Sequence, residues 1–302
     1  MRSWIKAGEW EIRVEGRLLR IARLEADGYE FLSDPEPVLE DLRKAKSRVD
    51  LFTFTQGLLA TTPKYSFPME WDNFAALPVT TFDHWWNQQI KSYPRNRARQ
   101  AEKKGVTLRE VPFDDELVQG IWGLYNEYPV RRGRAFSHYG KDIETVRREH
   151  ATFLDTSVFI GAFLDRQLIG FIKLTWDQNR TQANLMNILS MIDHRDKAPT
   201  NALIAHAVRA CADRNIQYLA YQRFSYGKKK EDSLTHFKEI NGFERVNVPR
   251  YYVPLTAIGR AALRLRLHHK LVDHLPERLL ARLRDARSAI NERKLKSAAE
   301  TS

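Results

Sequence analysis

The sequence predicts an α+β fold with a mixed central sheet, and the clearest support for this prediction lies in the central third of the chain. Within residues 158–176, two apolar runs rich in β-branched and aromatic residues flank a polar turn, as in a buried β-hairpin. A third apolar run, at 183–191, leads through a polar loop into a helix whose apolar residues recur at helical spacing from 203 to 211. With the flanking runs, these segments predict the order strand, helix, helix, three strands, helix, strand, helix, strand over residues 106–255.

The N-terminal part, residues 1–81, is predicted to be a small α+β cap followed by a connecting stretch. Residues 9–24 alternate apolar and polar side chains around Glu15-Gly16, which indicates a hairpin. A helix is predicted within 35–49, before a strand at 51–55. Residues 56–81 are interrupted by prolines and show little periodicity, so we expect them to run over the surface of the fold without regular structure.

The main domain is predicted to span residues 82–255, and a basic helical tail to span residues 256–302. The net charge of +11 falls in two places: residues 256–302 carry 11 basic and 5 acidic side chains, and residues 91–104 carry 6 and 1. Leucines at helical spacing in the tail predict two amphipathic helices broken at Pro276. These helices either pack on the chain's own core or contact a membrane surface. The helix at 91–104 is either a solvated face or a contact for RNA.

Length and composition fit a cytoplasmic enzyme. A chain of 302 residues with 43% hydrophobic content can bury a sizeable core. Its first residues lack the apolar stretch of a secretory signal, and no run approaches the roughly 20 apolar residues needed to cross a bilayer. The single cysteine, Cys211, falls on the apolar side of a predicted helix and excludes an internal disulfide. We predict a buried structural thiol there and no metal site; the oligomeric state stays open.

The junction between the strand at 183–191 and the following helix is the strongest predicted anion site. A strand that ends in a polar loop and leads into a helix presents the N–H groups of the first helical turn, and the helix dipole also favours negative charge there. A phosphate group is therefore the ligand expected at this junction.

At this point the residues resemble the GNAT superfamily of acyl-CoA N-acyltransferases. Residues 188–191 and 194–201 stand where members of that superfamily bind the pyrophosphate of coenzyme A. The usual glycine-rich signature is replaced by Arg195-Asp196-Lys197-Ala198-Pro199-Thr200, and the Fem-like branch, which includes aminoacyl-tRNA-dependent peptidyltransferases, has a similarly degenerate loop. Residues 93–111 and 232–246 also resemble segments of that branch, a basic helix ending in Lys-Lys-Gly-Val and a Phe-Lys-x-x-x-Gly-Phe segment. The resemblance covers residues 82–255.

The resemblance implies acyl-CoA, either acetyl-CoA or a longer form, as co-substrate. A bulge and splay between the third and fourth strands of the main run would open a wedge for the acyl group, its carbonyl near a backbone N–H of Leu189, Ser190 or Met191. The residues expected to hold the cofactor are Leu189, Ser190, Met191, His194, Arg195, Lys197, Ala198, Pro199, Thr200 and Asn201.

Two tyrosines near residue 224 are the candidates for the general acid. By resemblance, Tyr226 would protonate the leaving thiolate, because it follows the strand predicted at 218–224. Tyr221, within that strand, is the alternative. A packing role is the competing interpretation for both.

The loop at 128–141 is the candidate acceptor site, because it combines arginines with a histidine and a tyrosine. By resemblance, Arg131, Arg134 and Tyr139 would bind an acidic or sugar-like acceptor, and His138 would act as the base. The competing interpretation is a loop that its own arginines fix to the sheet.

Three functions remain open on this basis. The first is transfer of an acyl group from acyl-CoA to the amine of a small acceptor, such as an amino sugar or amino acid. The second is aminoacyl-tRNA-dependent transfer, in which the helix at Lys91 to Lys104 would contact tRNA. The third is a non-catalytic binding module with the same fold, bound peripherally to a membrane through the C-terminal helices.

Overall fold

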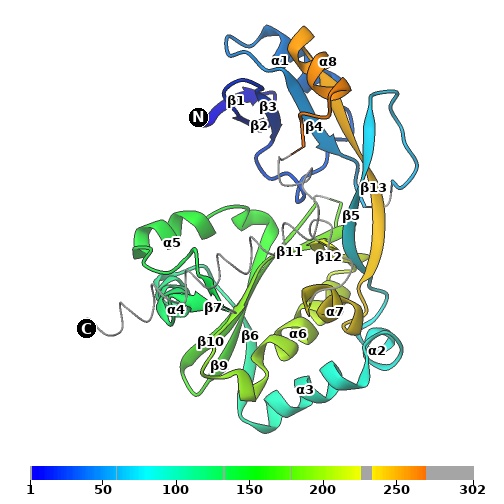
Figure 1. Ribbon diagram of the computed structural model, residues 1–302. Coiled ribbons are helices and arrows are strands. Elements are labelled where there is room, and N and C mark those ends of the chain that lie inside the picture. The colour runs from blue at the N-terminus through cyan, green and yellow to red at the C-terminus, as the bar shows by residue number, and fades with distance from the viewer. Residues whose placement is uncertain (1, 59, 132, 178, 226–232, 270–302) are drawn as a thin grey trace. The chain divides into compact units, whose positions relative to one another are not determined.

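The computed structural model describes residues 2–58, 60–131, 133–177, 179–225 and 233–269 (Figure 1). The chain divides into two compact units, and its described residues alternate between them. The first unit holds the residues up to Leu77, Ala220–Glu239 and those from Phe243 onward, whereas the second holds Pro78–Leu219 and Ile240–Gly242.

This division differs from the predicted one at the end of the main domain. Residues 220–255 were assigned to the domain that begins at residue 82, but all except 240–242 belong to the first unit. The reason is strand pairing: the strand at 244–254 hydrogen-bonds to two strands of the N-terminal region. The predicted tail is described only as far as His269, so Pro276 and the second predicted helix lie outside the described residues.

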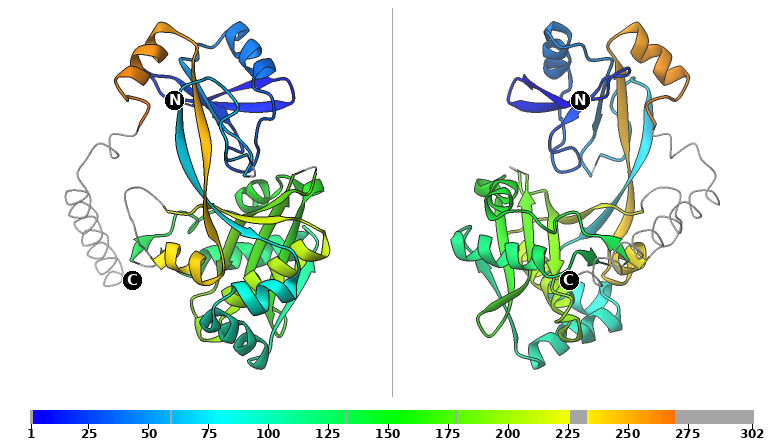
Figure 2. Two further views of the ribbon diagram at one scale, coloured as in Figure 1. Left: turned by 90° about the vertical axis from the view of Figure 1, so that its right-hand side faces the viewer. Right: turned by 60° about the vertical axis from the view of Figure 1, so that its left-hand side comes forward.

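The first unit is built on a mixed sheet in which β13 lies between β4 and β5 (Figure 2). β3 and β4 are parallel, whereas the pairs β1–β2, β2–β3, β4–β13 and β13–β5 are antiparallel. In spatial order the strands are β1 (Arg2–Ala7), β2 (Trp10–Glu15), β3 (Ile21–Leu24), β4 (Leu51–Thr55), β13 (Glu244–Pro254) and β5 (Met69–Pro78). The predicted hairpin around Glu15-Gly16 and the predicted strand at 51–55 are both present.

The expectation of an irregular connection over residues 56–81 was wrong, because β5 occupies its second half. A charged residue interrupts the apolar pattern of this strand. Asp72 is buried in β5, where its carboxylate pairs with Arg250 of β13. In the sequence, an aspartate and an arginine each predict an exposed position, because a charge is buried only when an opposite charge pairs with it.

Three helices complete the first unit: α1 (Glu36–Lys44), most of α7 (Ser233–Ile240) and α8 (Ala257–Arg264). α1 begins after Pro35 and buries Val38, Leu39 and Leu42 against the sheet. α8 packs on β13 and ends in a Schellman motif, in which Arg266 takes a left-handed conformation (φ 56°) and Leu267 N–H donates to the carbonyl of Ala262 at 2.8 Å.

The second unit is built on four antiparallel strands that confirm the predicted run. In spatial order they are β11 (Gln182–Ser190), β10 (Gln167–Trp176), β9 (Ser157–Leu164) and β6 (Val106–Val111). β12 (Tyr218–Arg223) begins in this unit and ends in the first. The register between β10 and β11 shifts by one residue between Lys173 and Leu174, which leaves Met186 of β11 as the extra residue of a β-bulge.

Helices cover both faces of this sheet (Figure 1). α4 (Asp115–Asn126) packs on β10 and on α5 (Ile143–His150), and α6 (Pro199–Asp213) packs on β9, β10 and α3 (Ser92–Lys103). The remaining elements are short: α2 (Phe82–His84), a π-helical turn (Trp85–Gln89), β7 (Val130–Arg131), β8 (Arg134–Ala135) and the 3-10 turns Leu154–Thr156 and Arg195–Lys197. None of the described helices combines the length and the apolar content needed to cross a membrane.

Candidate functional site

The candidate site is the end of β11 with the loop that leads into α6. The C-terminal half of β11, from Met186 to Ser190, is half-buried, whereas the preceding residues 182–185 are buried. The Ser190 hydroxyl lies 2.7 Å from that of Thr200, so this hydrogen bond ties the end of the strand to the first turn of the helix. Met191 N–H donates to the carbonyl of Ile169 at 2.8 Å, which makes it unavailable to an acyl carbonyl.

The backbone N–H groups of the loop after β11 bind a carboxylate of the protein itself, that of Glu127. The carboxylate of Glu127 accepts hydrogen bonds from Ile192 N–H at 2.7 and 2.9 Å and from Asp193 N–H at 3.0 Å. We expected the backbone N–H groups of this junction to face a ligand phosphate. Two of the loop's N–H groups are instead satisfied by a carboxylate of the chain itself.

Arg131 holds Glu127 in this position. Its guanidinium donates to the Glu127 carboxylate at 2.7 Å, to the carbonyl of Ser190 at 2.8 Å and to that of Leu124 at 3.0 Å, and it lies 4.7 Å from the ring centre of Phe136. Burial lowers the pKa of Arg131 from its usual value, partly offset by Glu127. The guanidinium therefore links the loop after α4 to the end of β11, the role of a fixing arginine rather than an acceptor ligand.

Basic side chains surround the turn before α6. Arg97 donates to the carbonyl of Arg195 at 2.8 Å, and Lys104 forms an ion pair with Asp196 at 3.0 Å. Ala198 is left-handed (φ 55°) and provides no side-chain cap, and Pro199 opens the helix. The "basic surface" consists of Lys91, Arg97, Arg99, Lys103 and Lys104 of the α3 region with Arg195 and Lys197 of the turn. His194 and Asn201, which were also expected to hold a cofactor, are half-buried in the same segment.

In the loop at 128–141, His138 is held in place by neighbouring side chains, whereas the predicted acceptor-binding residues Arg134 and Tyr139 are exposed. His138 stacks on Tyr125 with the ring centres 4.4 Å apart, and its Nδ1 lies 3.0 Å from the ammonium of Lys141. An ammonium only donates, so Nδ1 accepts and the proton of the neutral ring sits on Nε2. Burial, and next Lys141, lower the pKa of His138. His138 thus offers a hydrogen-bond donor at Nε2 rather than the predicted base. Arg134 and Tyr139 are exposed.

Beneath this loop lies a buried polar group that the sequence did not indicate. Tyr125 and His150 share a hydrogen bond of 2.9 Å, and burial lowers the pKa of His150 to about 4. Lys173 of β10 is fully buried; its ammonium donates to the carbonyls of His150 (2.8 Å) and Thr152, and burial lowers its pKa to about 8. Lys173 therefore binds carbonyls at the C-terminal end of α5, where the helix dipole favours a cation.

The structure does not place either tyrosine predicted as the general acid at the end of β11. Tyr226 lies outside the described residues. Tyr221 belongs to the first unit, where its ring lies 5.9 Å from that of Phe243 and the ammonium of Lys238 lies 4.7 Å above it. These contacts are those of a packed aromatic side chain.

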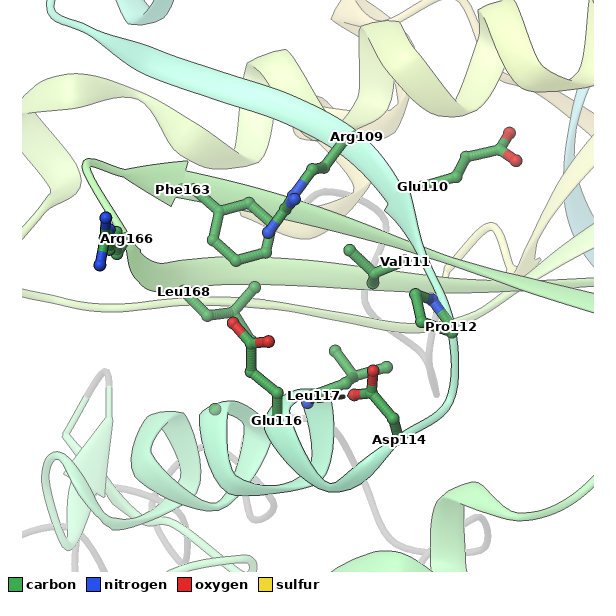
Figure 3. Close-up of a pocket in the computed structure, with 11 residues that line it drawn as sticks. Arg109, Glu110, Val111, Pro112, Asp114, Glu116, Leu117, Phe163, Arg166 and Leu168 are labelled. Carbon is green, nitrogen blue, oxygen red and sulfur yellow. Dashed lines mark hydrogen bonds between the residues drawn. The ribbon is translucent and has the colours of Figure 1, made fainter.

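A pocket of about 350 Å³ lies at the β6 edge of the second unit's sheet, and none of the predicted site residues lines it (Figure 3). Arg109 lies across the ring of Phe163, 4.5 Å from its centre. Two of the pocket's carboxylates have structural partners, because Asp114 caps α4 and Glu110 pairs with Arg214 at 2.8 Å. Glu110 and Asp114 are therefore engaged in structural contacts, and we place no chemistry in this pocket.

The fold is a GNAT-like α+β fold, similar to those of FemX and of lysylphosphatidylglycerol synthetase domains. No protein-family model matches the sequence, and no curated protein matches it. Among solved structures, the C-terminal domain of a putative lysylphosphatidylglycerol synthetase from Agrobacterium fabrum is similar, with a TM-score of 0.57 and 12% identity over 87% of each chain. L-PGS from Bacillus licheniformis is similar with a TM-score of 0.58 and 10% identity over 87% of each chain. FemX is similar with a TM-score of 0.53 and 12% identity over 82% of this chain and 87% of FemX.

One residue of the site, Glu127, was missed in the sequence although a signal for it was present. Glu127 and Arg131 stand four residues apart, a spacing at which opposite charges often pair. The partner of that pair, the loop at 192–193, is 65 residues away and could not be inferred without the fold.

Proposed function

We propose that this protein is an N-acyltransferase that takes an aminoacyl group from the ester of an aminoacyl-tRNA and transfers it to the amine of a small acceptor. The observation that carries the choice of donor is the Glu127 carboxylate, which accepts from Ile192 and Asp193 N–H. A diphosphate at this loop would meet a buried negative charge in place of two donors. An aminoacyl ester needs no such diphosphate site, since its polyanionic part is the RNA.

The basic surface supports a polyanionic donor. Exposed Lys91, Arg99, Lys103 and Lys104 lie on one helical segment, and Arg97 connects it to the turn at 195–196. Clustered lysines and arginines of this kind supply the salt-dependent part of RNA affinity. Exposed Tyr93 adds an aromatic ring next to these charges, suited to stacking on a base.

The name of one similar structure supports the same class of reaction. It is a putative lysylphosphatidylglycerol synthetase, by its name an enzyme that joins lysine to a lipid, which is aminoacyl transfer. For this chain the acceptor is proposed to be an amine. The amine nitrogen attacks the ester carbonyl, the C–N bond forms, the bond from that carbonyl to the ribose oxygen breaks, and the amine proton passes to the ribose oxygen. Alignment of the two reactants supplies most of the rate in such a transfer.

The donor is tested by binding and by transfer. The full chain should bind an aminoacyl-tRNA mixture with an affinity that falls steeply as salt rises. Reversing two charges of the basic surface, Arg99→Glu with Lys103→Glu, should weaken binding and reduce the slope of log affinity against log salt by roughly 2. The matched control reverses Arg43 and Lys44 on α1 of the other unit, both exposed, and should bind like the wild type.

Transfer is then measured with labelled aminoacyl-tRNA and a panel of amino sugars and amino acids. Label should appear in an amide product, and ribonuclease treatment of the donor should abolish the reaction. Loss of binding in both charge-reversed proteins alike would contradict the assignment of the basic surface. Tight RNA binding without any transfer would favour a non-catalytic binding module instead.

A second candidate donor is acyl-CoA, favoured by the N-terminus of α6. Ala198 leaves that end without a side-chain cap, and Arg195 and Lys197 flank it, an arrangement suited to phosphate. Titration with acetyl-CoA and longer acyl-CoAs distinguishes the two donors. Micromolar binding of an acyl-CoA, together with amide formation in the absence of RNA, would replace the aminoacyl-tRNA proposal.

A further inference from the structure

A carboxylate and two imidazoles meet at the C-terminal end of α8 in the first unit, away from any residue assigned above. One oxygen of Glu70 lies 3.1 Å from His268 Nε2 and 2.9 Å from His269 Nε2. The candidate ligand atoms of the three side chains all lie within 4.8 Å of one another. This is the only group of three or more His, Cys, Asp or Glu side chains with that geometry among the described residues.

The fold fixes each of the three side chains. Glu70 lies on β5, opposite Arg250 of β13. The Schellman motif that ends α8 turns the chain so that His268 and His269 follow directly. The ring of His268 packs edge-on against Tyr252, with ring centres 4.6 Å apart, and its side chain is only 4% exposed. The cluster is therefore held by a helix end and two paired strands.

Arg250, the cross-strand neighbour of Glu70, forms its ion pairs with other carboxylates. The guanidinium of Arg250 donates to Asp72 at 2.5 Å and to Asp27 at 3.0 Å. The ion pairs of Glu70 in the described part of the chain are the two to the imidazoles. A half-exposed carboxylate beside two imidazole nitrogens is a donor set for a divalent cation.

His268 has a second feature that packing does not explain. Its Nδ1 atom is buried and has no hydrogen-bond partner in the described structure. A buried imidazole with an unsatisfied nitrogen costs free energy. A hydrogen bond from Nε2 to Glu70 offsets only a small part of this free energy, whereas a metal–nitrogen bond at Nε2 would exceed it.

We propose that Glu70, His268 and His269 form a Zn²⁺ site that clamps the end of α8 to β5. Two histidines and one glutamate are three zinc ligands of the ordinary type, with a water in the fourth position. Metal–ligand distances of about 2.0–2.1 Å place tetrahedral ligand atoms about 3.3 Å apart. The observed 2.9 and 3.1 Å need to open by only a few tenths of an ångström.

The test is a metal titration of the full chain, stripped with chelator and free of any histidine tag. Calorimetry should give one Zn²⁺ per chain at micromolar affinity or tighter. Co²⁺ should give the visible bands of a tetrahedral site, and Zn²⁺ should raise the melting temperature. Glu70→Gln and His269→Ala each remove one ligand with little change in packing, and each should weaken Zn²⁺ binding by about 100-fold or more. Circular dichroism of the metal-free variants checks that they fold.

The matched control is His236→Ala, because His236 is an exposed histidine of α7 in the same unit, paired to Glu239 at 4.0 Å. Its Zn²⁺ affinity should equal that of the wild type. Millimolar or weaker binding to the wild type would overturn the proposal. So would unchanged affinity in both folded ligand variants, since the metal would then bind elsewhere.

Discussion

Glu127 and Arg131 show how one charged pair can decide what a loop is able to bind. Glu127 satisfies two N–H groups of the loop after β11, and Arg131 compensates its charge while holding the end of the strand. Both side chains are largely buried, with 8% and 13% exposed. Neither residue can be removed without leaving the other's charge uncompensated in the interior.

We therefore predict that Glu127→Ala lowers the free energy of unfolding by about 3 kcal/mol, measured by urea denaturation. Glu127→Gln keeps an acceptor for the loop and loses only the charge, so it should cost about 1–2 kcal/mol. Equal stability of the two variants would show that the carboxylate contributes nothing beyond its shape.

The neutral His150 makes stability depend on pH. Its pKa is lowered to about 4 in the folded chain, first by burial and then by Lys173, from an ordinary value of 6.5. Between these two values the unfolded chain binds a proton that the folded chain does not, so the free energy of unfolding falls as the pH falls from about 6.5 towards 4. The full loss from this residue is about 3 kcal/mol.

Unfolding measured at several pH values checks this prediction. His150→Gln has no titrating ring, so its stability should change less over this range, and the exposed His236→Gln should behave like the wild type. A variant His150→Gln that loses stability as steeply as the wild type would assign the pH dependence to other groups.

At this scale the sequence predicted the kinds of residues better than their roles. The arginines and the histidine of the 128–141 loop were identified, but Arg131 is tied to Ser190 and His138 to Lys141. Such roles depend on partners brought in by the fold, from 59 residues away for Ser190. Buried Lys173 gave no signal, because a lysine within an apolar strand reads as a residue on an exposed edge.

At the scale of elements, apolar periodicity predicted the strands and helices whose apolar pattern is not interrupted by buried polar residues. The hairpin of β9 and β10 turns at residues 165–166, and Asp165 takes the left-handed conformation (φ 54°) typical of a tight turn. β5 escaped prediction because its buried Asp72 breaks the apolar pattern. β1 was not predicted, because three of its six residues, Arg2, Ser3 and Lys6, are polar and leave no clear apolar pattern.

The contact of α8 with the start of β4 leads to a prediction for a single methyl group. A Cβ added to Gly259 would lie 1.9 Å from the carbonyl oxygen of Asp50, too close for any relaxed contact. Gly259→Ala should therefore push α8 away from the sheet and cost about 3 kcal/mol, measured by chemical denaturation.

The matched control is Gly123→Ala in α4, where an added Cβ meets nothing within 4 Å. Because alanine favours helix more than glycine does, this variant should gain about 0.5–1 kcal/mol. A neutral Gly259→Ala would mean that α8 does not pack on β4 as described.

At the scale of the whole molecule, the first unit is discontinuous in sequence. β13 lies between β4 and β5, so the N-terminal strands have no continuous sheet without residues 244–254. We predict that residues 1–77 alone remain unfolded by circular dichroism and by dispersion of amide resonances. Joining residues 220–269 to residue 77 through a flexible linker should restore cooperative unfolding, and a cooperative transition in the short fragment would refute this dependence.

The position of β13 also has a consequence for synthesis on the ribosome. β5 ends at residue 78 and β13 begins at residue 244, so the nascent chain must carry two unpaired strand edges while 165 intervening residues are made. At about 5–20 residues per second this interval lasts roughly 10–30 s. Unpaired strands invite pairing with other chains. The first 78 residues are therefore the part of the nascent chain most exposed to pairing with other chains, until β13 is synthesised.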